Sequence, residues 1–198
     1  SDAQMIKVAF IFLIVLLAPY PDLRSQEVKT SYDNLEDALE HPDDVIELDL
    51  KRKHLKEWPV EMSKFKNLKK LDLSHNKINA LPNDLSAFGS LEYLDLTMNK
   101  LDSLPNSIGD LASLKKLGLG NNEVYHVSPR IGQLKNLQVL EMWSNNVHYL
   151  PIEAGEMSNL MELDLRNIQM NQDHQNAIKA IFDSADLQIK FSMSCNCQ

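Results

Sequence analysis

Acidic side chains that recur at one register are the first residues in this sequence whose type and spacing could do chemistry. They follow one another at intervals of 23 residues or twice that, at Asp49, Asp72, Asp95, Glu141 and Asp164. Paired carboxylates can transfer protons or bind a divalent cation. Lysines stand beside them, however, and no cluster of carboxylates supplies the roughly six to eight oxygen ligands that calcium takes. The pattern therefore favours a solvated, charge-balanced surface over a catalytic or metal site.

Three other motifs lack the context that their chemistry requires. Gly118-Leu119-Gly120 is followed by no glycine three residues later and lies in no strand–turn–helix pattern, as a nucleotide-binding loop would. The six histidines form no H-E-x-x-H motif, and none pairs with a cysteine at zinc spacing. Cys195 and Cys197 are too few for a closed zinc site. They can bridge chains, stay free thiols or pack on the end of the domain, and we favour the last. We expect no enzyme, metal or cofactor.

The elements that position these residues follow a repeat of 23 residues. Apolar residues fill the first, fourth, sixth and eleventh positions of each repeat, and an apolar residue and a proline follow in most of them. The ninth position is Asn in the four inner repeats. The six repeats begin at Val45, Leu68, Leu91, Leu114, Leu137 and Leu160. Because the register holds without an insertion, one repeating structural unit is expected.

The pattern L-x-x-L-x-L-x-x-N-x-L, followed by L-P-x-x-I-x-x-L, resembles the leucine-rich repeat family in its 23-residue form, which is common in bacteria. The resemblance runs from Val45 to about Met170. It implies an α/β solenoid, a right-handed horseshoe with a parallel concave β-sheet, an irregular convex side and helical caps at both ends. The alternation of apolar and polar residues over positions three to seven independently predicts one strand per repeat.

The repeated asparagines are predicted to be structural. The chain must turn inside the core after each strand, where backbone N–H and C=O groups still need partners. A side-chain amide offers both a donor and an acceptor. We therefore expect a ladder formed by Asn76, Asn99, Asn122 and Asn145, and expect Asn99→Ala to destabilise the protein far more than Asn106→Ala.

The sequence divides into four segments. Residues 1–25 contain a signal-peptide-like apolar run, and residues 1–4 ahead of Met5 can be an expression remnant. Residues 26–44 hold a linker and a capping helix predicted over Ser31 to His41. Residues 45–172 hold the six repeats, and residues 173–198 a second cap. That cap comprises a helix from Asp173, its expected N-cap, to Phe182, with Ala177, Ile178 and Ile181 on its buried face, and a strand from Leu187 to Phe191.

The amino-terminal segment predicts export. Lys7 precedes an apolar run from Val8 to Ala18, which is shorter than the roughly 20 residues of a membrane span. This is the layout of a secretory signal peptide, with a possible cleavage point after Ser25. We expect a secreted, periplasmic or cell-surface protein. The alternative is an apolar arm that packs on the domain of a cytoplasmic protein.

The candidate binding residues lie at the outward positions of the concave sheet. Trp143 is expected beside Gly120, which leaves room for the indole, while Tyr93 and Met98 approach from the preceding repeat. Single exposed aromatic residues are normal, but several on one face indicate a binding surface. Tyr125 and Tyr149 could extend this surface at its edge. The predicted set is Trp143, Tyr93, Met98, Val139, Gly120, Gly118, Glu141 and Asp95.

These observations together predict a recognition module that binds another protein through its concave sheet. The net charge of −8 argues against a nucleic-acid partner and against docking on anionic lipid. A carbohydrate- or cell-wall-binding protein with Trp143 and Tyr93 as stacking platforms is one alternative. An intracellular regulatory scaffold is another, if the apolar segment is not a signal.

Overall fold

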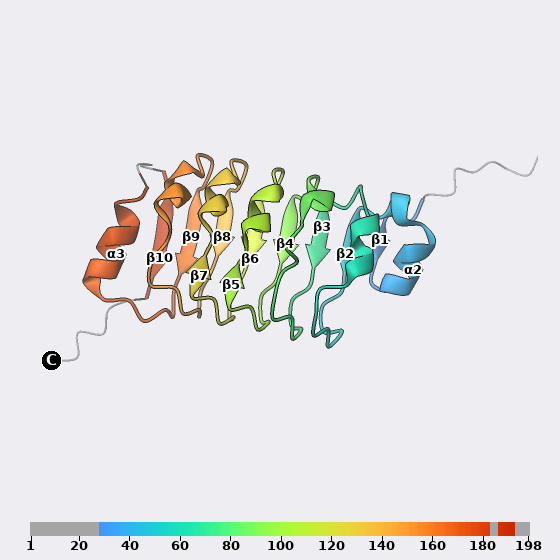
Figure 1. Ribbon diagram of the computed structural model, residues 1–198, viewed down its shortest axis with the longest axis horizontal. Helices are drawn as coiled ribbons and strands as arrows, with labels where there is room; N and C mark the ends of the chain where they lie inside the picture. Colours follow the sequence, from blue (N-terminus) through green and yellow to red (C-terminus); the bar gives the residue numbers. More distant parts are fainter. Residues whose placement is uncertain (1–27, 183–185, 193–198) are drawn as a thin grey trace, which may run out of the picture.

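A computed structural model describes residues 28–182 and 186–192. One parallel sheet runs through this part of the chain, and Figure 1 shows its strands side by side in sequence order. Its strands are β1 (Ser31–Tyr32), β2 (Glu47–Asp49), β3 (Lys70–Asp72), β4 (Tyr93–Asp95), β6 (Lys116–Gly118), β8 (Val139–Glu141), β9 (Glu162–Leu165) and β10 (Gln188–Phe191). The register repeats, since Leu71 pairs with Leu94 and Leu94 with Leu117. The predicted solenoid is confirmed.

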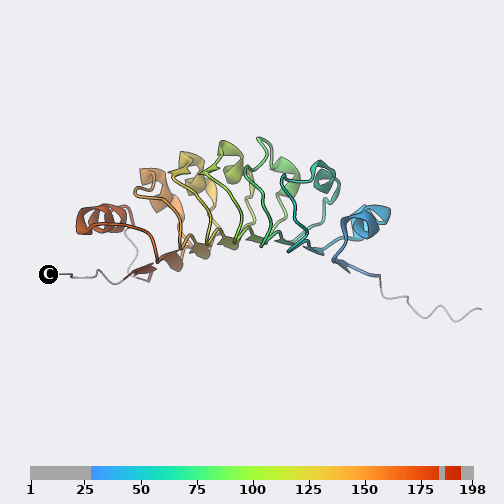
Figure 2. The ribbon, with the colours of Figure 1, turned by 90° about the horizontal axis from the view of Figure 1, so that it is seen from below.

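The sheet forms the concave side of a shallow arc, as Figure 2 shows, and short 3₁₀ helices form the convex side. These helices are η2 (Val60–Lys64), η3 (Ser86–Phe88), η4 (Asn106–Asp110), η5 (Pro129–Gln133) and η6 (Ile152–Glu156). Prolines stand at or just before the start of most of them, where their missing N–H groups cost no hydrogen bond. A short second sheet pairs β5 (Ser103–Leu104) with β7 (His126–Val127).

The repeated apolar positions form one continuous core between these two sides. Leu71, Leu94 and Leu117 are at most 1% exposed, so the strands turn these leucines inward as predicted. Trp58 is also buried and meets Phe88 edge to face, with 5.5 Å between the ring centroids. Each repeat covers the leucines of the next, which a single repeat could not bury alone.

The four asparagines lie inside the turn that follows each strand. The side chain of Asn99 donates to the carbonyl oxygens of Leu73 and Leu96, both at 3.0 Å, and accepts from the backbone N–H of Ile78 at 3.0 Å. Asn76, Asn122 and Asn145 make the corresponding contacts. Each amide therefore joins the backbone of its own repeat to the backbone of the preceding one.

The amino-terminal cap differs from the prediction. Helix α2 (Leu35–Glu40) is shorter than the helix expected over Ser31 to His41, and Ser31–Tyr32 is instead a strand that extends the sheet. Asn34 starts the helix by accepting a hydrogen bond from the N–H of Glu36. Tyr32 is 4% exposed and covers the core of the first repeat. The helical spacing of Leu35, Ala38 and Leu39 therefore predicted the helix correctly only from residue 35 onward.

The carboxyl-terminal cap contains helix α3 (Gln172–Lys179) and the strand β10, which was predicted. Its N-cap is Asn171, whose side chain accepts from the N–H of His174, so the assignment to Asp173 was wrong. Ile178 is buried, but Ala177 is exposed and does not belong to the packed face. Residues 1–25, with the candidate signal, and Cys195 and Cys197 lie outside the described residues. Within the described ranges, no helix is long and apolar enough to cross a membrane.

Candidate functional site

The concave surface is built from the outward positions of neighbouring strands. The register places Lys116 of β6 between Tyr93 of β4 and Val139 of β8. Two residues further along, Gly118 lies between Asp95 and Glu141. The predicted site residues therefore share one face but do not form one continuous apolar patch, because a lysine separates Tyr93 from Val139.

Gly118 and Gly120 make room on this face for two larger neighbours. A Cβ atom on Gly120 would overlap with Cε2 of the Trp143 indole, and one on Gly118 would lie 2.8 Å from Oδ1 of Asp95. The two neighbours lean over the fourth repeat from opposite sides, and both glycines are buried beneath them. The structure thus brings Trp143 and Gly120 together as expected, and adds a close approach of Asp95 to Gly118.

Tyr93 and Met98 are the most exposed apolar members of the predicted set, at 45% and 37%. Met98 has a positive φ of 56°, in the left-handed region, and its N–H donates to the oxygen of Gly120 at 2.8 Å. The eighth position of every repeat has this backbone conformation, at Arg52, His75, Met98, Asn121, Ser144 and Asn167. The chain leaves the concave sheet at this position.

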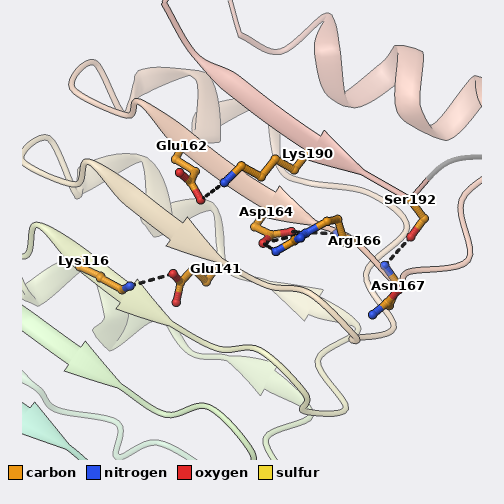
Figure 3. Close-up of polar contacts among 8 residues, drawn as sticks. All are labelled: Lys116, Glu141, Glu162, Asp164, Arg166, Asn167, Lys190 and Ser192. Carbon is orange, nitrogen blue, oxygen red and sulfur yellow. Dashed lines mark hydrogen bonds and ion pairs between the residues drawn. The ribbon is translucent and has the colours of Figure 1, made fainter.

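Ion pairs balance much of the charge on the concave face, and Figure 3 shows those of its carboxyl-terminal half. Lys116 Nζ lies 2.7 Å from Glu141 Oε1, and Lys190 pairs with Glu162. Arg166 Nη2 lies 2.6 Å from Asp164 Oδ2. In the first repeat, Lys51 Nζ lies 2.6 Å from Asp49 Oδ2. The expectation of a charge-balanced face holds for these residues.

The Asp164–Arg166 pair is the most sheltered of these, since the Asp164 side chain is only 3% exposed. Burial alone would raise the pKa of Asp164. Hydrogen bonds from the guanidinium and backbone N–H of Arg166, together with its positive charge, outweigh this and lower the pKa below its usual range. Asp164 is therefore held as a carboxylate that orients a cation.

The acidic column also has a structural role that the sequence interpretation missed. Asp72 accepts from the N–H of Ser74, and Asp95 accepts from the N–H of Thr97 at 2.8 Å. Asp49 and Asp164 make the equivalent contact two residues on. Aspartate side chains commonly accept from the backbone two residues later where a chain begins to turn. The recurrence of aspartate at the fifth position of four repeats, at or next to the last residue of the strand, was the available signal.

A second surface lies beyond the strands, at the edge of the fourth and fifth repeats. Tyr125 and Tyr149 are 64% and 65% exposed and line a groove of about 520 Å³ with His126 and His148. His174 of α3 meets Tyr149 edge to face, with 4.9 Å between ring centroids. The lining contains no residue of the concave strands. The two tyrosines therefore form a surface of their own, and the part played by His174 was not foreseen.

Histidine, cysteine and acidic side chains give no indication of a metal centre in the part of the chain that the structure describes. No group of three or more of them there could hold a metal ion.

Comparison with known proteins identifies the repeat. A profile of the leucine rich repeat family matches residues 44–101 and 66–124. A leucine-rich repeat protein of Leptospira interrogans is 29% identical in sequence over 84% of this chain and 47% of its own, with a TM-score of 0.63. The plant peptide hormone receptor RGFR1, in complex with RGF2, is 28% identical over 81% of this chain and 25% of its own, with a TM-score of 0.60. The chain thus spans about half the length of the first protein and a quarter of the second. A search of curated proteins finds no match.

Proposed function

Because this chain is a leucine-rich repeat protein, we propose that it is a non-enzymatic recognition module that binds another protein through the concave face of its sheet. Leucine-rich repeats serve in general for protein–protein recognition, and the plant receptor to which this chain is similar was solved in complex with RGF2. Extended concave surfaces of solenoids are suited to this use, since adjacent repeats offer adjacent contacts.

The observation that carries the proposal is the position of Trp143 over Gly120. The indole is half-buried against a backbone that has no side chain, so its orientation is set before any partner arrives. Binding then costs little side-chain entropy. Tryptophan is also among the residues most enriched at the centres of protein interfaces.

The hydrogen bonds that the charged groups of the concave face make favour a recognition role over catalysis. Most carboxylates on the concave face accept hydrogen bonds from the backbone or from cations, as Asp164 does from Arg166. Groups held in this way fix charges in space. A catalytic acid or base needs instead a free path to the proton it transfers.

Affinity capture with the wild-type protein and a Trp143→Ala variant tests this function. Proteins from the cells that produce the chain are captured on each, and a glycan array is probed in parallel. We expect captured proteins whose binding falls by about 30-fold in the variant, which corresponds to roughly 2 kcal/mol for a hot-spot residue. Capture that is unchanged in the variant, or Trp143-dependent binding to glycans alone, would contradict the proposal.

We further propose that the protein is exported and acts outside the cytoplasm. The support is the basic start and short apolar run between Met5 and Ala18, the layout of a signal peptide. Mass spectrometry of the naturally produced protein tests this directly. A first residue near Gln26 is expected, whereas a mature protein that retains Val8 to Ala18 would favour the intracellular scaffold.

A further inference from the structure

We propose that the partner presents a cationic side chain, arginine or lysine, to the carboxylate of Asp95 beside the indole of Trp143. This inference rests on the proposed function, because it names the chemistry that the same concave face would recognise. It depends on three observations: the charge on Asp95, the shape of the fourth repeat and the position of the indole.

Asp95 differs from most acidic residues of its column in having no cation of its own. Asp49, Glu141 and Asp164 pair with Lys51, Lys116 and Arg166, respectively. In the described part of the chain, Asp95 forms no ion pair, and its hydrogen bond comes from the backbone N–H of Thr97. The carboxylate therefore carries charge that a partner could balance.

Lys116, the cation on the neighbouring strand β6, could pair with Asp95 only by giving up its ion pair with Glu141. Lys116 lies on β6, next to β4, but its Nζ is 2.7 Å from Glu141 Oε1 on the far side. Gly118, which faces Asp95 directly, contributes no side chain. The fourth repeat thus leaves the carboxylate unbalanced at the middle of the sheet.

The same two glycines leave room for this carboxylate and for the indole of Trp143 over one repeat. Asp95 leans over Gly118 and Trp143 leans over Gly120, so both side chains lie over the fourth repeat. Gly118 and Gly120 are two residues apart, and this separation is about 6.6 Å along a strand. A guanidinium or ammonium group can contact a carboxylate and an indole face together at that spacing.

This pairing selects a cation over other ligands. An acidic group would be repelled by Asp95, and a purely apolar group would bury the carboxylate without a partner. Tyr93, two residues before Asp95 on the same face and 45% exposed, offers a second aromatic ring to an extended side chain such as arginine. The partner segment is therefore expected to be basic, which also suits the net charge of −8.

A random peptide library displayed on phage tests the inference. It is selected on the wild-type protein, on Asp95→Asn and on the matched control Asp49→Asn, which changes the same position in the first repeat. Asparagine retains an oxygen that can accept from Thr97 N–H, and thermal unfolding of each variant verifies that it folds. Selected peptides are then synthesised, and their affinities are measured from Trp143 fluorescence in a Trp58→Phe background, since the chain has two tryptophans.

The inference predicts that wild-type selections share an arginine or lysine at one position. These peptides should lose about tenfold or more in affinity on Asp95→Asn, a similar amount when that residue is changed to glutamine, and nothing on Asp49→Asn. Peptides that depend on Trp143 but share no cationic residue would overturn this inference and leave the proposed function standing. Peptides indifferent to both Trp143→Ala and Asp95→Asn, or a library without enrichment, would contradict both.

Discussion

The indole of Trp143 lies over Gly120 of the neighbouring repeat so closely that the glycine has no room for even one more carbon atom. The two residues are brought together by adjacent parallel strands, and Asn121 N–H donates to the Trp143 carbonyl oxygen at 2.7 Å beside them. The candidate binding surface depends on this contact, since it holds the indole in one orientation.

Replacing Gly120 with alanine should therefore displace Trp143. The added Cβ overlaps with the ring, so we expect Gly120→Ala to lower the free energy of unfolding by about 1–3 kcal/mol and to weaken partner binding. Gly89→Ala is the matched control, because its Cβ would meet only Ser86 O, at 3.7 Å. Urea denaturation measures both. Equal stabilities of the two variants would show that the indole moves aside freely.

Loss of one asparagine of the ladder should cost far more than loss of an exposed one. Asn99→Ala leaves buried backbone groups of Leu73, Leu96 and Ile78 without their partner, which should destabilise the protein by about 2 kcal/mol or more. Asn83 is exposed and is the better control. Asn106, the control expected from the sequence, accepts a hydrogen bond from Ser128 Oγ at 2.6 Å. Similar melting temperatures for Asn99→Ala and Asn83→Ala would refute the ladder.

The pH dependence of stability should include a contribution from Asp164. Its pKa is lowered in the folded protein, so its carboxylate stabilises the fold above the unfolded pKa of about 3.9. This contribution is lost as the pH falls through the lower, folded pKa. Urea denaturation at pH 7 and at pH 2–3 should show wild type more stable than Asp164→Asn at the higher pH, with the difference shrinking on acidification. A constant difference would disprove the assignment.

The eighth position of each repeat should reject β-branched residues. His75 is exposed with a φ of 56°, a conformation that costs a residue with a bulky Cβ about 1–2 kcal/mol and that asparagine tolerates better. We expect His75→Val to destabilise the protein and His75→Asn to leave it unchanged or slightly more stable. Lys77→Val, at an exposed site without a positive φ, controls for the change in side chain. The prediction fails if thermal unfolding gives His75→Val and Lys77→Val the same midpoint.

Much of the fold could be predicted because the repeat makes local and tertiary structure coincide. An apolar residue at the fourth position, such as Leu94, faces inward in its own repeat and meets Leu71 and Leu117 in the next ones. The same register placed Trp143 beside Gly120. The caps were predicted less well, since Ser31–Tyr32 and Asn171 lie where the period no longer applies.

The amino-acid sequence by itself determined which side chains face the core, which face the concave surface and where the asparagines turn the chain, because one period governs them all. Only the tertiary structure decided which charges pair. Lys116 forms an ion pair with Glu141, and Asp95 is left without a cation among the described residues. The tertiary structure also decided that α3 brings His174 against Tyr149. The ion pairs depend on the direction in which long side chains extend across neighbouring strands. The contact with Tyr149 depends on how α3, which lies outside the repeats, packs against them. A spacing of 23 residues encodes neither.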